Sequence, residues 1–321
     1  MLTGSVCGSW LCSSNHQDKG LLTGRFVTVS SSDSSGLRLF VLGHSKRPRV
    51  AEEAVRLRKE LGSECQIVAF DLEQKTELSS HSVDLAIVLG GDGAILRAAR
   101  QMGYNQVPVL GVNLGKLGFL ADLSPDELYQ RLPEILQREY HVVSHLMFEV
   151  TCERQQGTCE VFLGLNEVLI GAPTAFQITE VDLSIDGELV TSYSCDGLMV
   201  ATPVGSTGHS LSAGGPVLRQ DLDAFSITPI CPHTLTSRPL VDSADRTYEL
   251  VIRNRDSLLV VDGQQRLQLN KNDRVSIRRA PVRFQLARLA GHSYYRTLRL
   301  KLGLEGHPNY SPDANSTSAE D

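Results

Sequence analysis

DLAIVLGGDGAILRAAR, residues 84–100, joins an apolar run to a glycine-rich turn and a helical pattern. The run Asp84–Leu89 has the length of a strand and is almost continuously apolar, which is typical of a strand in a parallel sheet covered on both faces. Gly90–Gly93 follow at once, and a helix is predicted from Ala94 to about Met102. Because ligands of open α/β sheets bind at the carboxyl ends of strands, this stretch predicts an α/β fold with a ligand site beside the glycines.

The segments on either side continue the alternation of strand and helix. Leu37–Leu42, Gln66–Phe70 and Val107–Val112 are further apolar runs of strand length, and an apolar stripe between Val50 and Leu61 predicts a helix. These elements favour a Rossmann-like α/β domain. It is not a P-loop or dehydrogenase type, because the chain contains neither GxxxxGK[ST] nor GxGxxG.

The second half of the chain has a different texture. From about Tyr140, strand-like segments follow one another with turn signals such as Asp186-Gly187, which predicts an all-β, sandwich-like C-terminal domain. The expected organisation is a disordered or non-native tail over residues 1–36, an α/β domain over 37–139, a β-rich domain over 140–290, a C-terminal helix within 291–310 that packs back on the first domain, and a disordered tail over 311–321.

Composition narrows the function classes. The 321 residues carry a formal net charge of -6, so there is no basic excess to support nucleic-acid binding. No apolar run reaches the length of a membrane-spanning helix, and we expect no membrane partner. The seven cysteines are scattered, odd in number and without zinc spacing. We therefore expect a cytoplasmic globular protein.

Asp92 lies inside the predicted ligand turn. Backbone N–H groups and the start of a helix suit a phosphate, but a carboxylate would repel one, so its presence indicates another task. Asp92 could take a proton from a hydroxyl group, orient that group, or help to hold Mg²⁺. The structural alternative is that Asp92 only caps the helix.

Three further blocks contain residues suited to ligand binding. Residues 113–119 (NLGKLGF) end in Phe119, which could contact an adenine face or lie in the core. Asn166 and Glu167 interrupt an apolar strand; they suit ribose hydroxyls or form a solvent-facing pair. Residues 194–216 contain a loop rich in Gly, Ser and Thr whose hydroxyls could bind ligand oxygens, or which is a plain loop.

These blocks, followed by TPICPHTLTSRP at residues 228–239, resemble the NAD kinase family in order and spacing over about Leu37–Gly303. The resemblance implies phosphorylation of the 2′-hydroxyl of the adenosine ribose of NAD to give NADP. It implies that Asp92 is the catalytic carboxylate and that Gly93 and Arg97 lie against the dinucleotide or phosphates. Asn166 and Glu167 would bind NAD hydroxyls, and the other NAD-binding residues implied are Gln177, Ser194, Asp196, Thr207, Gly208, His209, Ser210, Leu211, Ser212 and Gln264.

The resemblance also implies the other components of the reaction. These are a divalent metal, usually Mg²⁺, for which no ligand residue is assigned, and ATP or polyphosphate as the phosphoryl donor. It implies a homodimer or homotetramer.

The chain departs from the family pattern at a few positions. Ala94 stands where Thr is common, Gly208-His209 replace a common Ala-Tyr, and Ser194 stands where many members carry Arg. Two alternatives stay open: a non-catalytic NAD-binding regulatory protein, and a lipid or sugar kinase of the same superfamily. Asp92 argues against the first, and the blocks after residue 165 argue against the second.

Overall fold

The computed structural model describes residues 27–28, 36–47, 49–154, 157, 159–174, 177–234, 236–254 and 256–303. Apart from residues 27, 28 and 36, the two tails expected to be disordered lie outside this range. Val27 and Thr28 form β1 (Val27–Thr28), which pairs antiparallel with β6 (His141–Glu153). No helix in the described part of the chain is long and apolar enough to cross a membrane.

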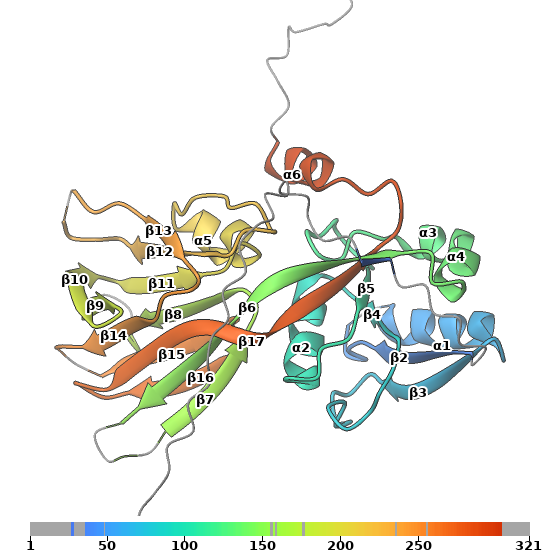
Figure 1. The fold of residues 1–321 in the computed structure, drawn as a ribbon, viewed down its shortest axis with the longest axis horizontal. Helices are drawn as coiled ribbons and strands as arrows, with labels where there is room; N and C mark the ends of the chain where they lie inside the picture. The colour runs from blue at the N-terminus through green and yellow to red at the C-terminus, as the bar shows by residue number, and fades with distance from the viewer. Residues whose placement is uncertain are drawn as a thin grey trace, which may run out of the picture.

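The first domain contains a parallel sheet with strand order β3-β2-β4-β5 (Figure 1). Alternate side chains of its strands face two separate cores. One core holds α2, and the other holds α1, α3 and α4, so both faces are covered. This arrangement explains why the strands are apolar throughout. The elements are β2 (Leu37–Leu42), α1 (Val50–Leu61), β3 (Cys65–Asp71), β4 (Leu85–Leu89), α2 (Asp92–Met102), β5 (Val109–Val112), α3 (Pro125–Gln130) and α4 (Leu132–Leu136).

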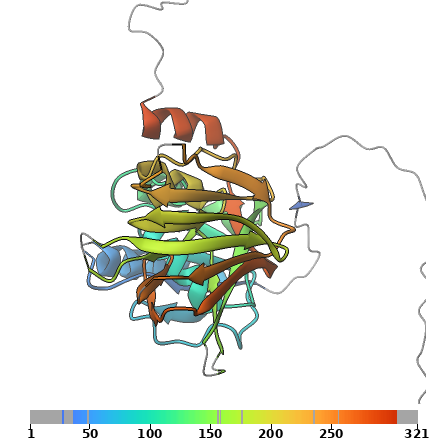
Figure 2. The ribbon, with the colours of Figure 1, turned by 90° about the vertical axis from the view of Figure 1, so that its left-hand side faces the viewer.

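The second domain is rich in antiparallel strands, which pack as two layers (Figure 2). A six-stranded sheet of order β13-β12-β11-β8-β15-β16 faces strands of the larger sheet across one apolar core. The elements are β7 (Cys159–Gly164), β8 (Glu167–Gly171), β9 (Thr179–Ile185), β10 (Glu188–Cys195), β11 (Gly197–Ala201), the 3-10 helix η1 (Gly205–Thr207), α5 (His209–Ser212), β12 (Ala224–Ile230), β13 (Leu240–Ser243), β14 (Tyr248–Ile252), β15 (Ser257–Val261), β16 (Gln265–Leu269), β17 (Arg274–Arg288) and α6 (Tyr294–Leu302).

The two domains share one sheet. The 15-residue strand β17 pairs with β14 and β6 in the second domain and reaches β5 of the first, where Leu286 lies beside Val109 in parallel register. The result is an 11-stranded sheet that passes through both domains, visible in Figure 1 as the long orange and green strands. The predicted combination of a mixed α/β domain and a β-rich domain is confirmed, but the sequence did not indicate the shared strand.

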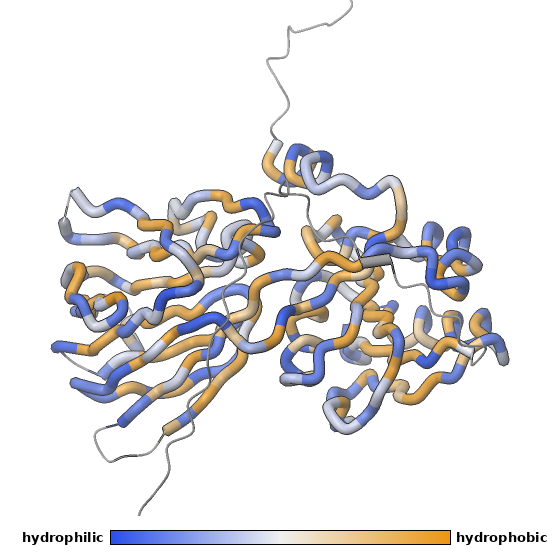
Figure 3. The backbone as a smooth tube through the Cα atoms, in the orientation of Figure 1, coloured by the Kyte–Doolittle hydropathy of each residue, from blue (hydrophilic) through white to orange (hydrophobic). Residues whose placement is uncertain are grey.

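Side-chain hydropathy follows this architecture. In Figure 3 the strands of the parallel sheet are mainly apolar, whereas polar residues dominate the outer turns and helix surfaces. The helix α6 contacts both domains: the Tyr294 hydroxyl donates to the Leu218 carbonyl, and the Lys301 ammonium lies 5.2 Å from the centre of the Phe119 ring. The five cysteines within the described residues are free thiols.

Candidate active site

Asp92 begins α2 directly after β4. Gly91 is the N-cap residue, so Asp92 is not the helix cap. Gly90 has φ +141°, and a Cβ there would lie 2.8 Å from Cβ of Ala94. Glycine therefore permits the abrupt turn from strand to helix. The N–H groups at the start of α2 and its dipole make this turn favourable for anions.

The Asp92 carboxylate is held by the loop that follows β5. It accepts hydrogen bonds from the backbone N–H groups of Phe119 at 2.9 Å, Leu120 at 3.0 Å and Ala121 at 3.0 Å. A Cβ at Gly118 would lie 2.1 Å from Asp92 Oδ1, so the loop approaches this closely only with glycine there. Phe119 itself is 8% exposed, beneath Lys301. Asp92 is thus fixed before any ligand binds.

Arg97 of α2 lies near two other arginines, Arg47 and Arg100. Arg97 of α2 is half-buried, and no partner for its Nε exists among the residues that the structure describes. Burial lowers the pKa of its guanidinium, and the charges of Arg47 and Arg100 lower it further. Arg47 and Arg100 were not predicted as site residues. Neighbouring guanidinium groups of this kind are suited to binding an anion.

Asn166 and Glu167 are brought together at the start of β8. Asn166 precedes the strand and Glu167 is its first residue, so the expectation that both residues interrupt one strand is wrong for Asn166. Glu167 is 5% exposed, and burial, followed by the nearby charge of Asp262, raises the pKa of its carboxyl group to about 8. Asn166 Oδ1 and Glu167 Oε2 are buried acceptors without a partner in the described part of the molecule.

The loop after β11 packs directly on this pair. A Cβ at Gly205 would lie 2.0 Å from the Asn166 carbonyl oxygen, so a side chain has no room there. The Thr202 hydroxyl donates to the Leu165 carbonyl at 2.6 Å, and the Thr202 N–H donates to the Asn166 carbonyl at 2.9 Å. A Cβ at Gly208 would lie 3.5 Å from Asn166 Nδ2. The Gly/Ser/Thr block is therefore a hydrogen-bonded wall of this site and not a free loop.

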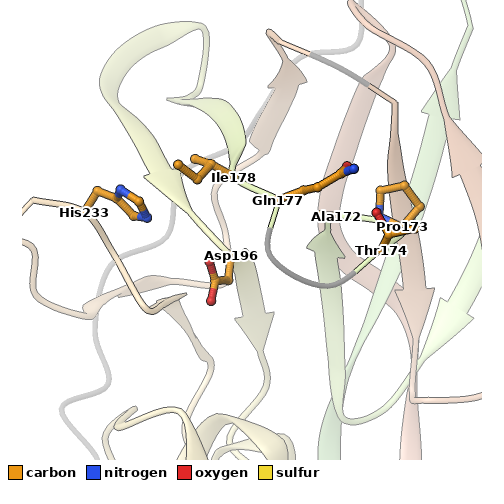
Figure 4. A pocket seen from close by; sticks show the side chains of 7 residues that line it. All are labelled: Ala172, Pro173, Thr174, Gln177, Ile178, Asp196 and His233. Carbon is orange, nitrogen blue, oxygen red and sulfur yellow. The ribbon is translucent and has the colours of Figure 1, made fainter.

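Several other predicted residues surround a separate, open pocket. Its volume is about 640 Å³, and Asp196, Gln177 and His233 supply three of its polar side chains. Figure 4 shows these three side chains with Ala172, Pro173, Thr174 and Ile178. The Ser194 carbonyl accepts from the His233 N–H at 2.9 Å. This places Ser194 beside the pocket.

The remaining predicted residues differ in accessibility. Gly93, Gly208, His209 and Ser212 are exposed, whereas Thr207, Leu211 and Gln264 are half-buried. Ser210 is buried, with its hydroxyl 3.4 Å from that of Thr228. Within the described residues no three His, Cys, Asp or Glu side chains form a metal-binding group.

The helix that begins with Asp92 packs against the second domain, next to the residue that precedes Asn166. Leu165 and Val204 of the second domain belong to the same apolar cluster as the buried face of α2. The fold and site therefore define a class: two-domain nucleotide-binding enzymes in which a Gly-Gly-Asp-Gly turn faces a β-rich domain.

Comparisons with known proteins identify the family within this class. Residues 25–140 match the ATP-NAD kinase N-terminal domain, and residues 165–289 match the ATP-NAD kinase C-terminal domain. The chain is 48% identical over 298 residues to the NAD kinase of Rhodopirellula baltica, covering 90% of this chain and 96% of the relative. It is 40% identical over 245 residues to that of Carboxydothermus hydrogenoformans, covering 75% and 86%. The chain belongs to the NAD kinase family, and its activity is that of this phosphotransferase.

Solved structures share this fold. A yeast NADH kinase complexed with NADH has a similar fold, with a TM-score of 0.77 over 85% of this chain and 89% of that one, at 23% identity. An NAD kinase from Archaeoglobus fulgidus in complex with ATP has a TM-score of 0.69 at 26% identity, over 84% of this chain and all of that one.

Proposed function

We propose that this chain transfers the terminal phosphoryl group of ATP to the 2′-hydroxyl of the adenosine ribose of NAD, and that Asp92 is the catalytic carboxylate. The observation that carries the proposal is the fixed position of Asp92, whose carboxylate is held by three backbone amides at the start of α2. An alcohol is a poor nucleophile at its ordinary pKa, so a positioned proton acceptor assists its attack.

The NAD hydroxyls would bind at Asn166 and Glu167. Their two buried, unpartnered acceptor atoms favour a ligand that brings neighbouring O–H donors, as a ribose does. Thr207–Ser212 and Gln264 would complete this half of the site. Gln177, Ser194 and Asp196 would hold the rest of the dinucleotide at the open pocket.

The phosphates of the donor would lie beside Gly93 and Arg97. The anion-favouring start of α2 and the neighbouring cations of Arg47, Arg97 and Arg100 support this placement. The relative from Archaeoglobus fulgidus, which was solved with ATP, favours ATP over polyphosphate as the donor.

A divalent ion fits the same place. Mg²⁺ in nucleotide sites is commonly held by one or two carboxylates together with substrate phosphates, so the absence of a larger carboxylate group in the described residues is no obstacle. Asp92 would hold it with the donor phosphates. When bound, the ion offsets negative charge on the phosphoryl oxygens.

The residues of this chain account for the transfer step. The 2′-hydroxyl proton passes to the Asp92 carboxylate as the 2′-oxygen forms a bond to the terminal phosphorus. The bond from that phosphorus to the bridging oxygen breaks, and ADP leaves with the electron pair. The arginines stabilise the spreading negative charge, while Asn166 and Glu167 bind the ribose hydroxyls.

NADP formation by the purified protein tests this proposal directly. With NAD, ATP and Mg²⁺, the Asp92→Asn variant should lose kcat by roughly 10²–10⁴-fold, the usual contribution of an acid–base group, while NAD still binds. Asp126→Asn, in the exposed first turn of α3, is the matched control and should keep its activity.

A negative result would favour the non-catalytic alternative. If folded wild-type protein binds NAD but makes no NADP, with polyphosphate and NADH also tried, the protein is an NAD-binding regulator. Ala94, one of the residues behind that alternative, is buried against the apolar cluster of α2.

Two finer features belong to the same proposal. The strand order β3-β2-β4-β5 supports a Rossmann-like first domain. Exposed apolar side chains at two sheet edges, Leu189 and Val190 in β10 and Val241 in β13, support a homodimer or homotetramer.

A further inference from the structure

Asp262 lies in the turn between β15 and β16, and its side chain points toward the backbone of the turn that precedes β8. Asp262 and Gly263 connect β15 to β16, with φ +49° and +66° respectively. The Asp262 carboxylate accepts from the N–H groups of Leu165 at 2.9 Å, Asn166 at 2.7 Å and Glu167 at 3.2 Å. The Asp262 N–H in turn donates to the Glu167 carbonyl at 2.9 Å. One residue therefore binds the whole turn that precedes β8.

This turn carries the two unpartnered acceptors of the site. Asn166 Oδ1 and Glu167 Oε2 have no hydrogen-bond partner of their own in the described residues. Their positions therefore depend on the position of the backbone that carries them. Backbone amides away from water need acceptors, and a carboxylate that receives three of them is a strong and directional one. The Asp262 carboxylate fixes the backbone of Asn166 and Glu167, just as the loop amides fix the carboxylate of Asp92.

The charge of Asp262 acts on the same pair. Burial raises the pKa of Glu167 to about 8, and the negative charge of Asp262 adds to this shift. Burial also raises the pKa of Asp262 itself, to about 6, against the three amide hydrogen bonds and the charge of Arg100. Arg100 is on α2, the helix that begins with Asp92. Asp262 thus interacts electrostatically with both halves of the site.

We propose that Asp262 is a positioning residue for NAD recognition, which holds Asn166 and Glu167 in the orientation that binds the ribose hydroxyls. It acts through these two residues and not by contact with the ligand. The inference rests on the proposed function, in which Asn166 and Glu167 bind NAD hydroxyls.

The test compares three variants by calorimetric binding of NAD and by steady-state kinetics. Asp262→Asn loses the charge and at least one amide acceptor, so the Kd and KM for NAD should rise by about tenfold or more, the equivalent of one charged hydrogen bond, while kcat changes less than threefold. Asp186→Asn is the matched control, because Asp186 also begins an Asp-Gly hairpin turn with positive φ and accepts a backbone N–H, from Thr247. It should leave Kd and KM unchanged.

A pH profile separates positioning from a general loss of structure. In the wild-type protein, NAD affinity should rise as the pH rises through the pKa of Glu167, because the ionised carboxylate accepts hydroxyl hydrogen bonds more strongly. Glu167→Gln should flatten this profile. Asp262→Asn removes a negative neighbour of Glu167, so its rise in affinity should move to lower pH.

Each outcome has a defined meaning. Unchanged Kd and pH profile in a folded Asp262→Asn variant would overturn the inference. If Glu167→Gln also leaves Kd unchanged, the proposed binding of NAD hydroxyls fails instead. Should Asp262→Asn fail to fold, Asp262→Glu takes its place: it keeps the charge but shifts the carboxylate from the three amides, so Kd must rise without a shift of the pH profile.

Discussion

The carboxyl group of Glu167 is buried at the start of β8, so its titration links the stability of the folded protein to pH. Its pKa is about 8 in the folded protein, raised by burial and by Asp262, against an ordinary value near 4.3 when unfolded. The folded state therefore binds a proton that the unfolded state lacks between these two values. In this window the free energy of unfolding falls as the pH rises. Above pH 8 Glu167 is ionised in both states, and the stabilisation that came from its bound proton is lost.

Replacing Glu167 by Gln should remove this pH dependence. Without NAD, the variant should be more stable than the wild type at pH 9 by on the order of 1–3 kcal/mol, and nearly equal to it at pH 5. Urea unfolding at the two pH values measures the difference. Glu188→Gln, on the exposed face of β10, is the control and should show no such change. A variant less stable than the wild type at both pH values would contradict the argument.

At the scale of elements, the loop between β5 and α3 depends on the end of β17. Asp122 pairs with Arg288 Nη1 at 3.2 Å and with His292 Nδ1 at 3.3 Å. Arg288 Nη2 also donates to the Phe119 carbonyl at 3.3 Å, beside the amides that hold Asp92. Arg288 is only 7% exposed, so this ion pair is a buried one. The loop that positions Asp92 is thus bound to β17 through Arg288.

Breaking this pair should cost both stability and turnover. Asp122→Asn leaves the Arg288 guanidinium buried without its counter-ion, and we expect a loss of about 3 kcal/mol in unfolding free energy, with a lower kcat. Lys75→Gln, which removes an exposed ion pair with Glu73, should change the free energy of unfolding far less than Asp122→Asn. Equal, small effects in the two variants would refute the role of the buried pair.

The same pair gives a pH signature. The hydrogen bond and charge of Asp122 raise the pKa of His292. Stability from the protonated imidazole is therefore complete below the ordinary His pKa and is lost as the pH rises through the raised one. The cost of Asp122→Asn should accordingly be larger at pH 6 than at pH 9.

At the scale of the whole molecule, the two domains should unfold together. Strand β17 carries one sheet through both, and Leu165, Val204 and Phe284 share an apolar cluster with α2. Scanning calorimetry should give a single transition whose calorimetric and van't Hoff enthalpies agree. Leu165→Ala should lower the midpoint of this transition, at a cost of about 2–5 kcal/mol.

A surface variant provides the comparison. Val161→Ala removes an exposed apolar side chain in β7 and should change stability by no more than about 0.5 kcal/mol. Two resolved transitions, of which Leu165→Ala shifts only one, would show that the shared sheet does not couple the domains.

The helices, the strands and the blocks that contain the candidate site residues could be predicted from the sequence alone. Continuous apolar runs indicated buried parallel strands, and glycines marked the turn at Asp92, because these features depend on neighbours a few residues apart. The family pattern also connected Asp92, Asn166 and Glu167 to one reaction before their positions were known.

How those residues are held depends on contacts between distant parts of the chain. Asp262 accepts amides 95 to 97 residues earlier in the chain, and Asp92 accepts amides 27 to 29 residues later. An Asp-Gly pair between two strands predicts a hairpin turn, but nothing local says which distant amides its carboxylate will meet. Likewise, β17 has the pattern of an ordinary strand, and its place beside β5 follows from the packing of two apolar cores. Local periodicity specifies which face of an element is buried, whereas the partner on that face is chosen by the packing of the whole chain.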